Sequence, residues 1–147
     1  MKNKNILLIF YIGILIIISD QITKFLITKY MALHQSIPLI KNILHLTYIQ
    51  NTGAGFGILK GSNTILIFTS LIIIGVILFN FKKIIKEKPV HIPIALILGG
   101  AIGNLIDRIL IGHVIDFIDF RIWPAFNVAD SAITIGAVWL IIYFWKK

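Results

Sequence analysis

Residues 92–111 read IPIALILGGAIGNLIDRILI, an apolar run with polar side chains near its end. Its length matches the roughly 20 residues that a helix needs to cross the hydrocarbon core of a bilayer. Gly99, Gly100 and Gly103 would let another chain approach this helix closely. We therefore predict a membrane-spanning helix that packs tightly against its neighbours.

Three further apolar segments accompany this one, and hydrophobic residues make up 58% of the 147-residue chain. That proportion is too high for an ordinary soluble domain. We predict a single integral membrane domain, residues 1–147, of the all-α class with four transmembrane helices. The predicted spans are residues 6–28, 64–81, 92–111 and 131–145.

The basic residues predict the orientation of the chain in the membrane. They contribute to a formal net charge of +8, and they gather at the ends of the apolar runs rather than among exposed aromatic residues, which argues against nucleic acid as a partner. The densest group lies at residues 82–88, and further lysines flank both termini. By the positive-inside rule these segments are cytoplasmic, so residues 29–63 and 112–130 form the outer connections.

The first outer connection alternates apolar and polar residues around His45 and then breaks at a glycine-rich stretch, residues 51–57. Alternation followed by glycines is typical of strands and a tight turn. We predict a small extracytoplasmic β-cradle here, lying on the membrane surface. In the second outer connection we expect a short periplasmic or extracellular helix or loop.

Charged side chains within the spans need a reason, because each costs roughly 2.5 to 3.5 kcal/mol unless it is paired or lines a wet cavity. Asp20 and Lys24 are one helical turn apart and can neutralise each other, either as a structural tie between helices or as part of a site. Asn104, Asp107 and Arg108 show the same helical spacing, and ion pairing that ties helices together is the structural alternative for this group as well. For Asn104 and Arg108 we favour a functional role, since the glycines on the preceding turns would let another chain come near.

The second outer connection carries two carboxylates, Asp116 and Asp130, on either side of a short loop. Two aspartates that face each other share a proton, so that one activates a water molecule while the other donates to a substrate carbonyl. Asp119 is a competitor for the role of Asp116, and the residues alone do not separate the two. The structural alternative is helix capping by Asn127 or Asp130, with Asp116 solvated in a loop.

Other kinds of site fit the sequence less well. The absence of cysteine excludes disulfides and thiolate chemistry, and the four histidines show no metal-ligand spacing, so we expect neither a metal nor a cofactor. A proton or ion conductor would need a polar path across the bundle, whereas the polar residues gather toward the outer ends of the spans. A non-enzymatic assembly factor would leave the paired aspartates unexplained.

Five short motifs follow one another along the chain. They are residues 19–24 (SDQITK), 51–56 (NTGAGF), 99–108 (GGAIGNLIDR), 114–117 (VIDF) and 126–130 (FNVAD). With these motifs in this order and four spans, the chain resembles the lipoprotein (type II) signal peptidase family over essentially its whole length.

The resemblance implies an intramembrane aspartic endopeptidase. Such an enzyme removes the signal peptide from diacylglyceryl-modified prolipoproteins and cleaves just before the lipidated cysteine. The resemblance places catalysis on Asp116 and Asp130, without a cofactor, and gives the charged pair Asp20 and Lys24 a supporting role. It also implies polar residues that line the site and hold the substrate, or the cyclic peptide inhibitor globomycin. These residues are Asn51, Gly53, Asn104, Arg108 and Asn127.

The same resemblance implies a location. The protein is expected to be a multi-pass protein of the bacterial cell membrane, with both termini in the cytoplasm and the active site near the outer face. Its expected partners are the prolipoprotein substrate and membrane lipids, and it is expected to act as a monomer.

Overall fold

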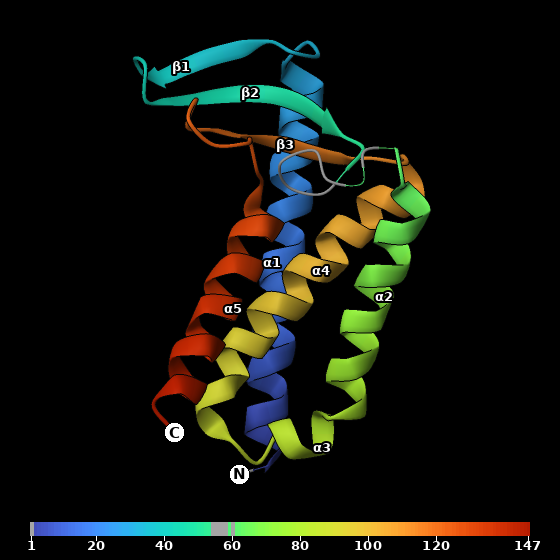
Figure 1. The fold of residues 1–147 in the computed structure, drawn as a ribbon, viewed down its shortest axis with the longest axis vertical. Helices are drawn as coiled ribbons and strands as arrows, with labels where there is room; N and C mark the ends of the chain where they lie inside the picture. Colours follow the sequence, from blue (N-terminus) through green and yellow to red (C-terminus); the bar gives the residue numbers. More distant parts are fainter. Residues whose placement is uncertain (1, 54–58, 60) are drawn as a thin grey trace.

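The computed structural model describes residues 2–53, 59 and 61–147. Within these residues the protein is mostly helical, with a three-stranded sheet at one end of a helix bundle (Figure 1). The long helices are α1 (Lys2–Tyr30), α2 (Asn63–Phe79), α4 (His91–Leu110) and α5 (Val128–Trp145); a short helix α3 (Phe81–Ile84) and a 3-10 turn η2 (Lys88–Val90) join α2 to α4. The tight turn predicted for the glycine-rich stretch, residues 51–57, lies for the most part outside the described residues.

The four predicted spans all fall on long helices. Three of these helices, α1, α4 and α5, are long and apolar enough to cross a membrane by length and composition, as judged over the described part of the chain. The fourth, α2, is equally apolar in character but is 17 residues long, or about 26 Å at the rise of an α-helix. The structure therefore supports a multi-pass membrane protein with three candidate spans, and it does not confirm the predicted fourth.

Helix α4 lies in the middle of the bundle, and its glycines explain why. A Cβ atom added to Gly99 would lie 2.8 Å from the carbonyl oxygen of Gly13 in α1. One added to Gly100 would collide with the carbonyl of Ala129 in α5. The prediction that these small residues permit close approach is confirmed, and the backbone of α4 is held against α1 on one side and α5 on another.

The predicted β-cradle is present and extends further than expected. Strands β1 (Ser36–Ile40) and β2 (Leu44–Asn51) form an antiparallel hairpin in the first connection. A third strand, β3 (Val114–Asp119), comes from the second connection and pairs antiparallel with β2. The expectation of a helix or loop there was wrong for residues 114–119, because pairing with the far-off β2 satisfies their backbone groups.

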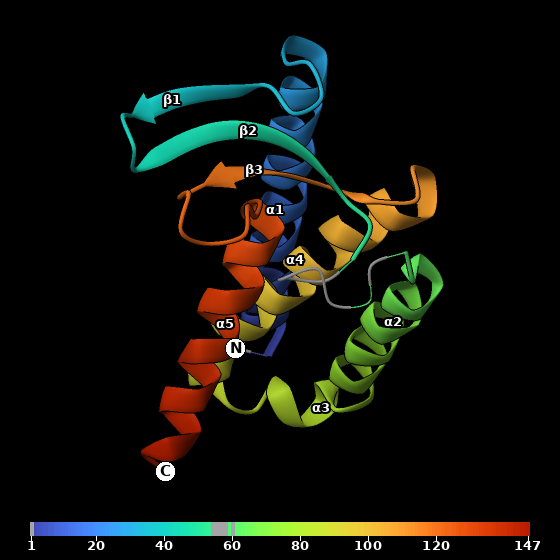
Figure 2. The ribbon, with the colours of Figure 1, turned by 45° about the horizontal axis from the view of Figure 1, so that its top comes forward.

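The sheet is anchored to the end of α1. Ile27 of α1 and Met31, which directly follows that helix, form one apolar cluster with Tyr48 of β2 and with Ile115 and Phe117 of β3. Because side chains alternate along a strand, the residue between Ile115 and Phe117 points the other way, toward α4 and α5. Figure 2 shows the sheet lying across the ends of α1 and α5.

The chain then folds back on β3 before entering α5. The backbone N–H of Ile118 donates to the carbonyl of Phe126 at 2.8 Å, and Phe126 donates back to Ile118 at 3.0 Å. This bridge places the start of α5 beside the middle of β3. Asp116 in β3 and residues 127–130 at the start of α5 therefore lie side by side.

The tight packing of α4 can be tested at Gly99. We expect Gly99→Ala to lower the free energy of unfolding by about 1 to 3 kcal/mol, because the new methyl group meets both the backbone oxygen of Gly13 and the β-branched side chain of Ile16 in α1 at 2.8 Å. Gly75→Ala in α2 is the matched control, since nothing lies within 4 Å of its added Cβ. Thermal unfolding in detergent would measure both, and an equal effect of the two substitutions would contradict the packing described.

Candidate active site

A cavity of about 610 Å³ lies where the sheet meets the ends of α4 and α5. Both carboxylates singled out in the sequence, Asp116 and Asp130, line it. The remaining wall combines polar side chains with apolar ones from the loop before α5 and from α5 itself. The lining residues are Asn51, Gly53, Asn104, Arg108, Val114, Asp116, Trp123, Pro124, Ala125, Phe126, Asp130, Ser131, Ile133, Thr134 and Ile135.

Asp116 is held in the middle of β3 with 1% of its surface exposed. Its Oδ1 accepts a hydrogen bond from the Asn127 side-chain amide at 2.7 Å, and its Oδ2 accepts one from Asn51 Nδ2 at 2.8 Å. Asn51 ends β2 opposite Val114, so strand pairing brings its amide to the carboxylate. The structural alternative of a solvated Asp116 is wrong, because the residue is in a strand and is buried.

Asp130 lies in the first turn of α5. Its Oδ1 accepts from Asn104 Nδ2 at 2.8 Å, and its Oδ2 accepts from the backbone N–H of Asn127 at 3.3 Å. The Asn127 side chain in turn accepts from the backbone N–H of Asp130 at 2.8 Å, which completes a capping box. The predicted helix capping is therefore present, and it uses the same residues as the site.

Asn127 connects the two carboxylates. Its Oδ1 caps α5, while its Nδ2 points to Asp116 and, at 3.1 Å, to Asn104 Oδ1. The residue is fully buried, so neither end of the amide can exchange its partner for water. One amide thus fixes the start of α5 and one carboxylate of the pair in a single geometry.

The electrostatics of the pair favour a retained proton. Burial, followed by the negative charge of Asp130, raises the pKa of Asp116 to about 7, against opposing hydrogen bonds from Asn51 and Asn127 and the charge of Lys24. Two carboxylates at one site cannot both ionise cheaply. Near neutral pH the pair therefore tends to hold one proton between its two members.

Asp119, the competitor for the role of Asp116, has a different environment. Its carboxylate accepts from Thr47 at 2.8 Å and forms an ion pair with Arg121 at 3.1 Å. Burial raises the pKa of Asp119, but the hydrogen bonds from Thr47 and Arg121 outweigh it and hold that pKa below its usual value. Asp119 is a paired carboxylate that does not line the cavity.

The other sequence-predicted residues also gather at the cavity. Arg108 donates from Nη2 to the carbonyl of Gly53 at 2.8 Å, which ties the end of β2 to α4. Gly53 donates its backbone N–H to Asn51 Oδ1 at 2.9 Å, so the amide of Asn51 is fixed at both ends. The structure brings together Asn51, Gly53, Asn104, Arg108 and Asn127 around the two aspartates.

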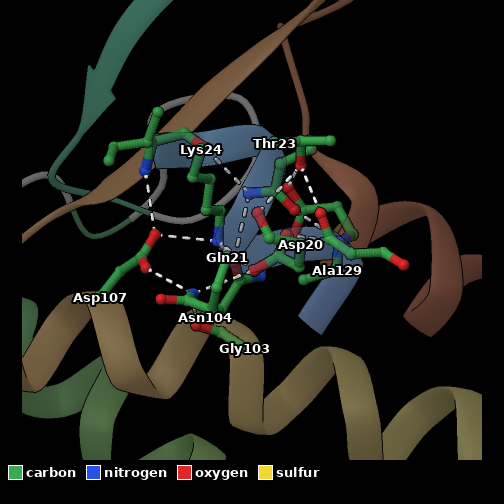
Figure 3. A network of polar contacts seen from close by, with 12 residues as sticks. Asp20, Gln21, Thr23, Lys24, Gly103, Asn104, Asp107 and Ala129 are labelled. Atoms are coloured by element: carbon green, nitrogen blue, oxygen red, sulfur yellow. Dashed lines mark hydrogen bonds and ion pairs between the residues drawn. The ribbon is translucent and has the colours of Figure 1, made fainter. Parts of the chain in front are cut away.

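The charged pair of α1 is joined to the cavity residue Asn104 within a network of polar contacts (Figure 3). Lys24 forms ion pairs with Asp20 at 2.7 Å and with Asp107 at 2.8 Å. The predicted neutralisation of Asp20 by Lys24 is confirmed. The alternative of ion pairing that ties helices together holds for Asp107, which pairs with Lys24; sequence reasoning missed that Gln21 Nε2 donates to Asp107 at 2.9 Å. The helical spacing of Gln21 and Lys24, three apart in α1, was the available signal.

Among the residues that the structure describes, no group of three or more His, Cys, Asp or Glu side chains is arranged to hold a metal ion. The polar side chains that line the cavity beside the two aspartates are the amides of Asn51 and Asn104, the guanidinium of Arg108 and the hydroxyls of Ser131 and Thr134. Such donors can hold a peptide backbone and its carbonyl oxygen. Chemically, the arrangement provides a shared proton, two carboxylates and several fixed N–H donors beside a partly apolar cavity.

The fold and this site define a multi-pass membrane protein whose cavity holds a close pair of aspartates. The profile of the signal peptidase (SPase) II family matches residues 12–146. The chain belongs to this family, and it is therefore a peptidase.

Individual relatives agree with this assignment. A lipoprotein signal peptidase of Halothermothrix orenii is 44% identical over 140 residues, which cover 95% of this chain and 97% of the relative. One of Syntrophus aciditrophicus is 44% identical over 157 residues, covering 100% of this chain and 97% of the relative. Two solved structures described as bacterial membrane enzymes are each 37% identical, with TM-scores of 0.86 and 0.83; they cover 94% and 95% of this chain, and 87% and 93% of their own.

The shared proton gives a titration prediction. We expect Asp116 to ionise as pH rises through about 7, and we expect Asp130→Asn to lower the pKa of Asp116, because the neighbouring negative charge that raises it is gone. The protonated carboxyl stretch in infrared difference spectra, assigned by its loss in Asp116→Asn, would follow this titration. Asp119→Asn is the control and should leave the Asp116 midpoint in place. An unchanged midpoint in Asp130→Asn would show that the two carboxylates do not interact.

Proposed function

We propose that this protein is an intramembrane aspartic endopeptidase that acts on diacylglyceryl-modified prolipoproteins and cleaves just before the lipidated cysteine. Removal of signal peptides from prolipoproteins follows from membership of the signal peptidase II family. The aspartic mechanism is supported by one observation above all: two carboxylates, the buried Asp116 and the half-buried Asp130, line one cavity, and both accept hydrogen bonds from Asn127.

In the proposed mechanism the two aspartates hold one water molecule against the scissile carbonyl. The ionised member takes a proton from the water, and the protonated member donates to the carbonyl oxygen, so a non-covalent tetrahedral intermediate forms. The Asp116 pKa of about 7 supports a proton held in the pair near neutral pH. Collapse of the intermediate returns a proton to the leaving amine and restores the pair.

The substrate is held, in this proposal, by the polar wall of the cavity. Asn51, Gly53 and Arg108 lie where β2 meets α4, and they would bind the extended backbone around the scissile bond. Asn104 and Asn127 lie closer to the carboxylates and donate to them. The apolar side chains on α5, such as Ile133 and Ile135, face the same cavity and suit a hydrophobic signal segment or acyl chain.

We further propose a four-span topology. Helix α2 is about 26 Å long by its 17 residues, close to the roughly 30 Å of a bilayer core, and α3 follows almost at once. The chain ends lie at the end of the bundle away from the sheet (Figure 1). With the lysine-rich residues 82–88 in the cytoplasm, both termini are cytoplasmic and the site lies near the outer face. We propose that the single chain, as a monomer, forms the complete site.

The assignment of the aspartates is directly testable. We expect Asp116→Asn and Asp130→Asn each to reduce cleavage of a synthetic diacylglyceryl prolipoprotein by about a hundredfold or more, because each removes a carboxylate while keeping its shape. A gel shift of the substrate measures the cleavage, and thermal unfolding shows that the variants are folded.

Asp119→Asn is the matched control for these variants. It removes a carboxylate only three residues from Asp116, and it should retain near-normal cleavage because Asp119 does not line the cavity. Globomycin should block the wild-type reaction. Residual activity within a few-fold of wild type in either Asp116→Asn or Asp130→Asn would overturn the dyad.

The pKa of Asp116 also predicts how activity depends on pH. A raised pKa means that the carboxyl is protonated below about pH 7 and ionised above it. We therefore expect kcat to fall as pH rises past about 7, because the pair then loses the proton that it must donate. Steady-state cleavage on both sides of this pH, with thermal unfolding at each pH as the control, measures the effect. A kcat that rises across the same range would contradict the shared-proton mechanism.

A further inference from the structure

The ammonium group of Lys24 has three partners, which equals the number of its N–H donors. Two are the carboxylates of Asp20 and Asp107, at 2.7 and 2.8 Å. The third is not a charged group: Lys24 Nζ donates to Asn104 Oδ1 at 3.0 Å. Lys24 is 2% exposed, so water does not compete for this third bond. Figure 3 shows the side chains of α1 and α4 that meet here.

This third bond determines which way the Asn104 amide faces. An ammonium group only donates, so the atom of Asn104 that faces Lys24 must be its oxygen. The nitrogen of the same amide then points to Asp130, where Nδ2 donates to Oδ1 at 2.8 Å. Rotating the amide by half a turn would set an NH₂ group against the ammonium and an oxygen against the carboxylate. Both contacts would be repulsive in a buried place.

The oriented amide also reaches the second carboxylate. Asn104 Oδ1, the atom that accepts from Lys24, accepts from Asn127 Nδ2 as well, at 3.1 Å. The same Asn127 nitrogen donates to Asp116 at 2.7 Å. A continuous set of hydrogen bonds therefore joins Lys24 through two amides to both aspartates. Lys24 donates to Asn104 and Asn104 donates to Asp130, whereas Asn127 donates both to Asn104 and to Asp116.

The carboxylates of Asp20 and Asp107 also accept hydrogen bonds from groups other than Lys24. Asp20 Oδ1 accepts from the backbone N–H of Ala129 at 2.9 Å, which joins α1 to the start of α5. Asp107 accepts from Gln21 at 2.9 Å and from the backbone N–H of Ile115 at 3.3 Å. A variant that lacks the ammonium group therefore keeps these ties between the helices and the sheet.

From these contacts we infer that Lys24 is a positioning residue for the peptidase reaction, which orients the amide of Asn104 and through it the carboxylates of Asp130 and Asp116. This inference rests on the proposed function of the two aspartates. Lys24 then does more than neutralise Asp20: it contributes to catalysis. It does so without touching the substrate.

A double-mutant cycle tests the inference. We expect Lys24→Met and Asn104→Ala each to lower kcat for prolipoprotein cleavage by about tenfold or more, with little change in KM. The double variant should be no slower than the slower single variant, because both substitutions disable one route and such effects are not additive. If the two losses multiply in the double variant, Lys24 does not act through Asn104 and the inference fails.

Lys24→Gln separates the orientation of the Asn104 amide from the charge of Lys24. Glutamine also lacks the charge but can donate to Asn104, whereas methionine cannot donate at all. Both variants should show a similar loss of thermal stability, and Lys24→Gln should recover part of the kcat that Lys24→Met loses. Equal kcat for the two variants would indicate a purely structural ion pair. Thr23→Val is the matched control, because Thr23 bonds within its own helix, to Ser19 and Asp20 carbonyls, and it should keep wild-type kcat.

Wild-type cleavage and the Asp116→Asn variant are measured first with the same substrate. Failure of the wild type to cleave, or full activity in Asp116→Asn, rejects the proposed function itself. If the wild type cleaves and Asp116→Asn does not, but the kcat losses of Lys24→Met and Asn104→Ala multiply in the double variant, only the role of Lys24 is rejected.

Discussion

The ammonium group of Lys24 lies where water does not reach it, and the arrangement of three helices follows from how its charge is satisfied. A charge in such a place is tolerated only when it is paired and hydrogen-bonded. Lys24 and Asp20 come from α1 and Asp107 from α4, while Asp20 also binds the first turn of α5 through the N–H of Ala129. The glycines of α4 make this contact possible, because a Cβ on Gly103 would lie 2.7 Å from the Asp20 carboxylate.

From this centre the polar contacts continue without a break into the cavity. In the side-chain amides of Asn104 and Asn127, the oxygen and the nitrogen each have their own fixed hydrogen-bond partners. Helix capping and site construction are therefore not competing explanations of Asn127 and Asp130. The capping box that starts α5 is also what sets the distance between the helix and the strand that carries Asp116. Stability of the helix start and geometry of the carboxylate pair come from the same few bonds.

The sheet provides the second half of the site. Pairing of β2 with β3 places Asn51 near Asp116, and the apolar cluster of Ile27, Tyr48 and Phe117 holds the sheet on α1. Alternation along β3 buries Ile115 and Phe117 against α1 and leaves Asp116 to face the cavity. Asp119 is drawn into bonds with Thr47 and Arg121 instead. Two aspartates three residues apart thereby have different environments, although their local sequences are alike.

Sequence reasoning was sufficient for the apolar helices, the close packing at the α4 glycines, the hairpin of β1 and β2, and the Asp20–Lys24 pair, because each depends on composition or on spacing within one segment. The residues alone pointed to Asn104, Arg108 and the aspartates, whereas the site roles of Asn51, Gly53 and Asn127 and the choice of Asp116 over Asp119 came from the family resemblance. Three features were not predictable in this way. They are strand β3, the ion pair of Asp107 with Lys24, and the hydrogen bonds that lead from Lys24 through Asn104 to the aspartates. Each depends on a partner 63 or more residues away in the chain or on the direction of a side-chain amide, and such contacts exist only once the helices and the sheet have packed.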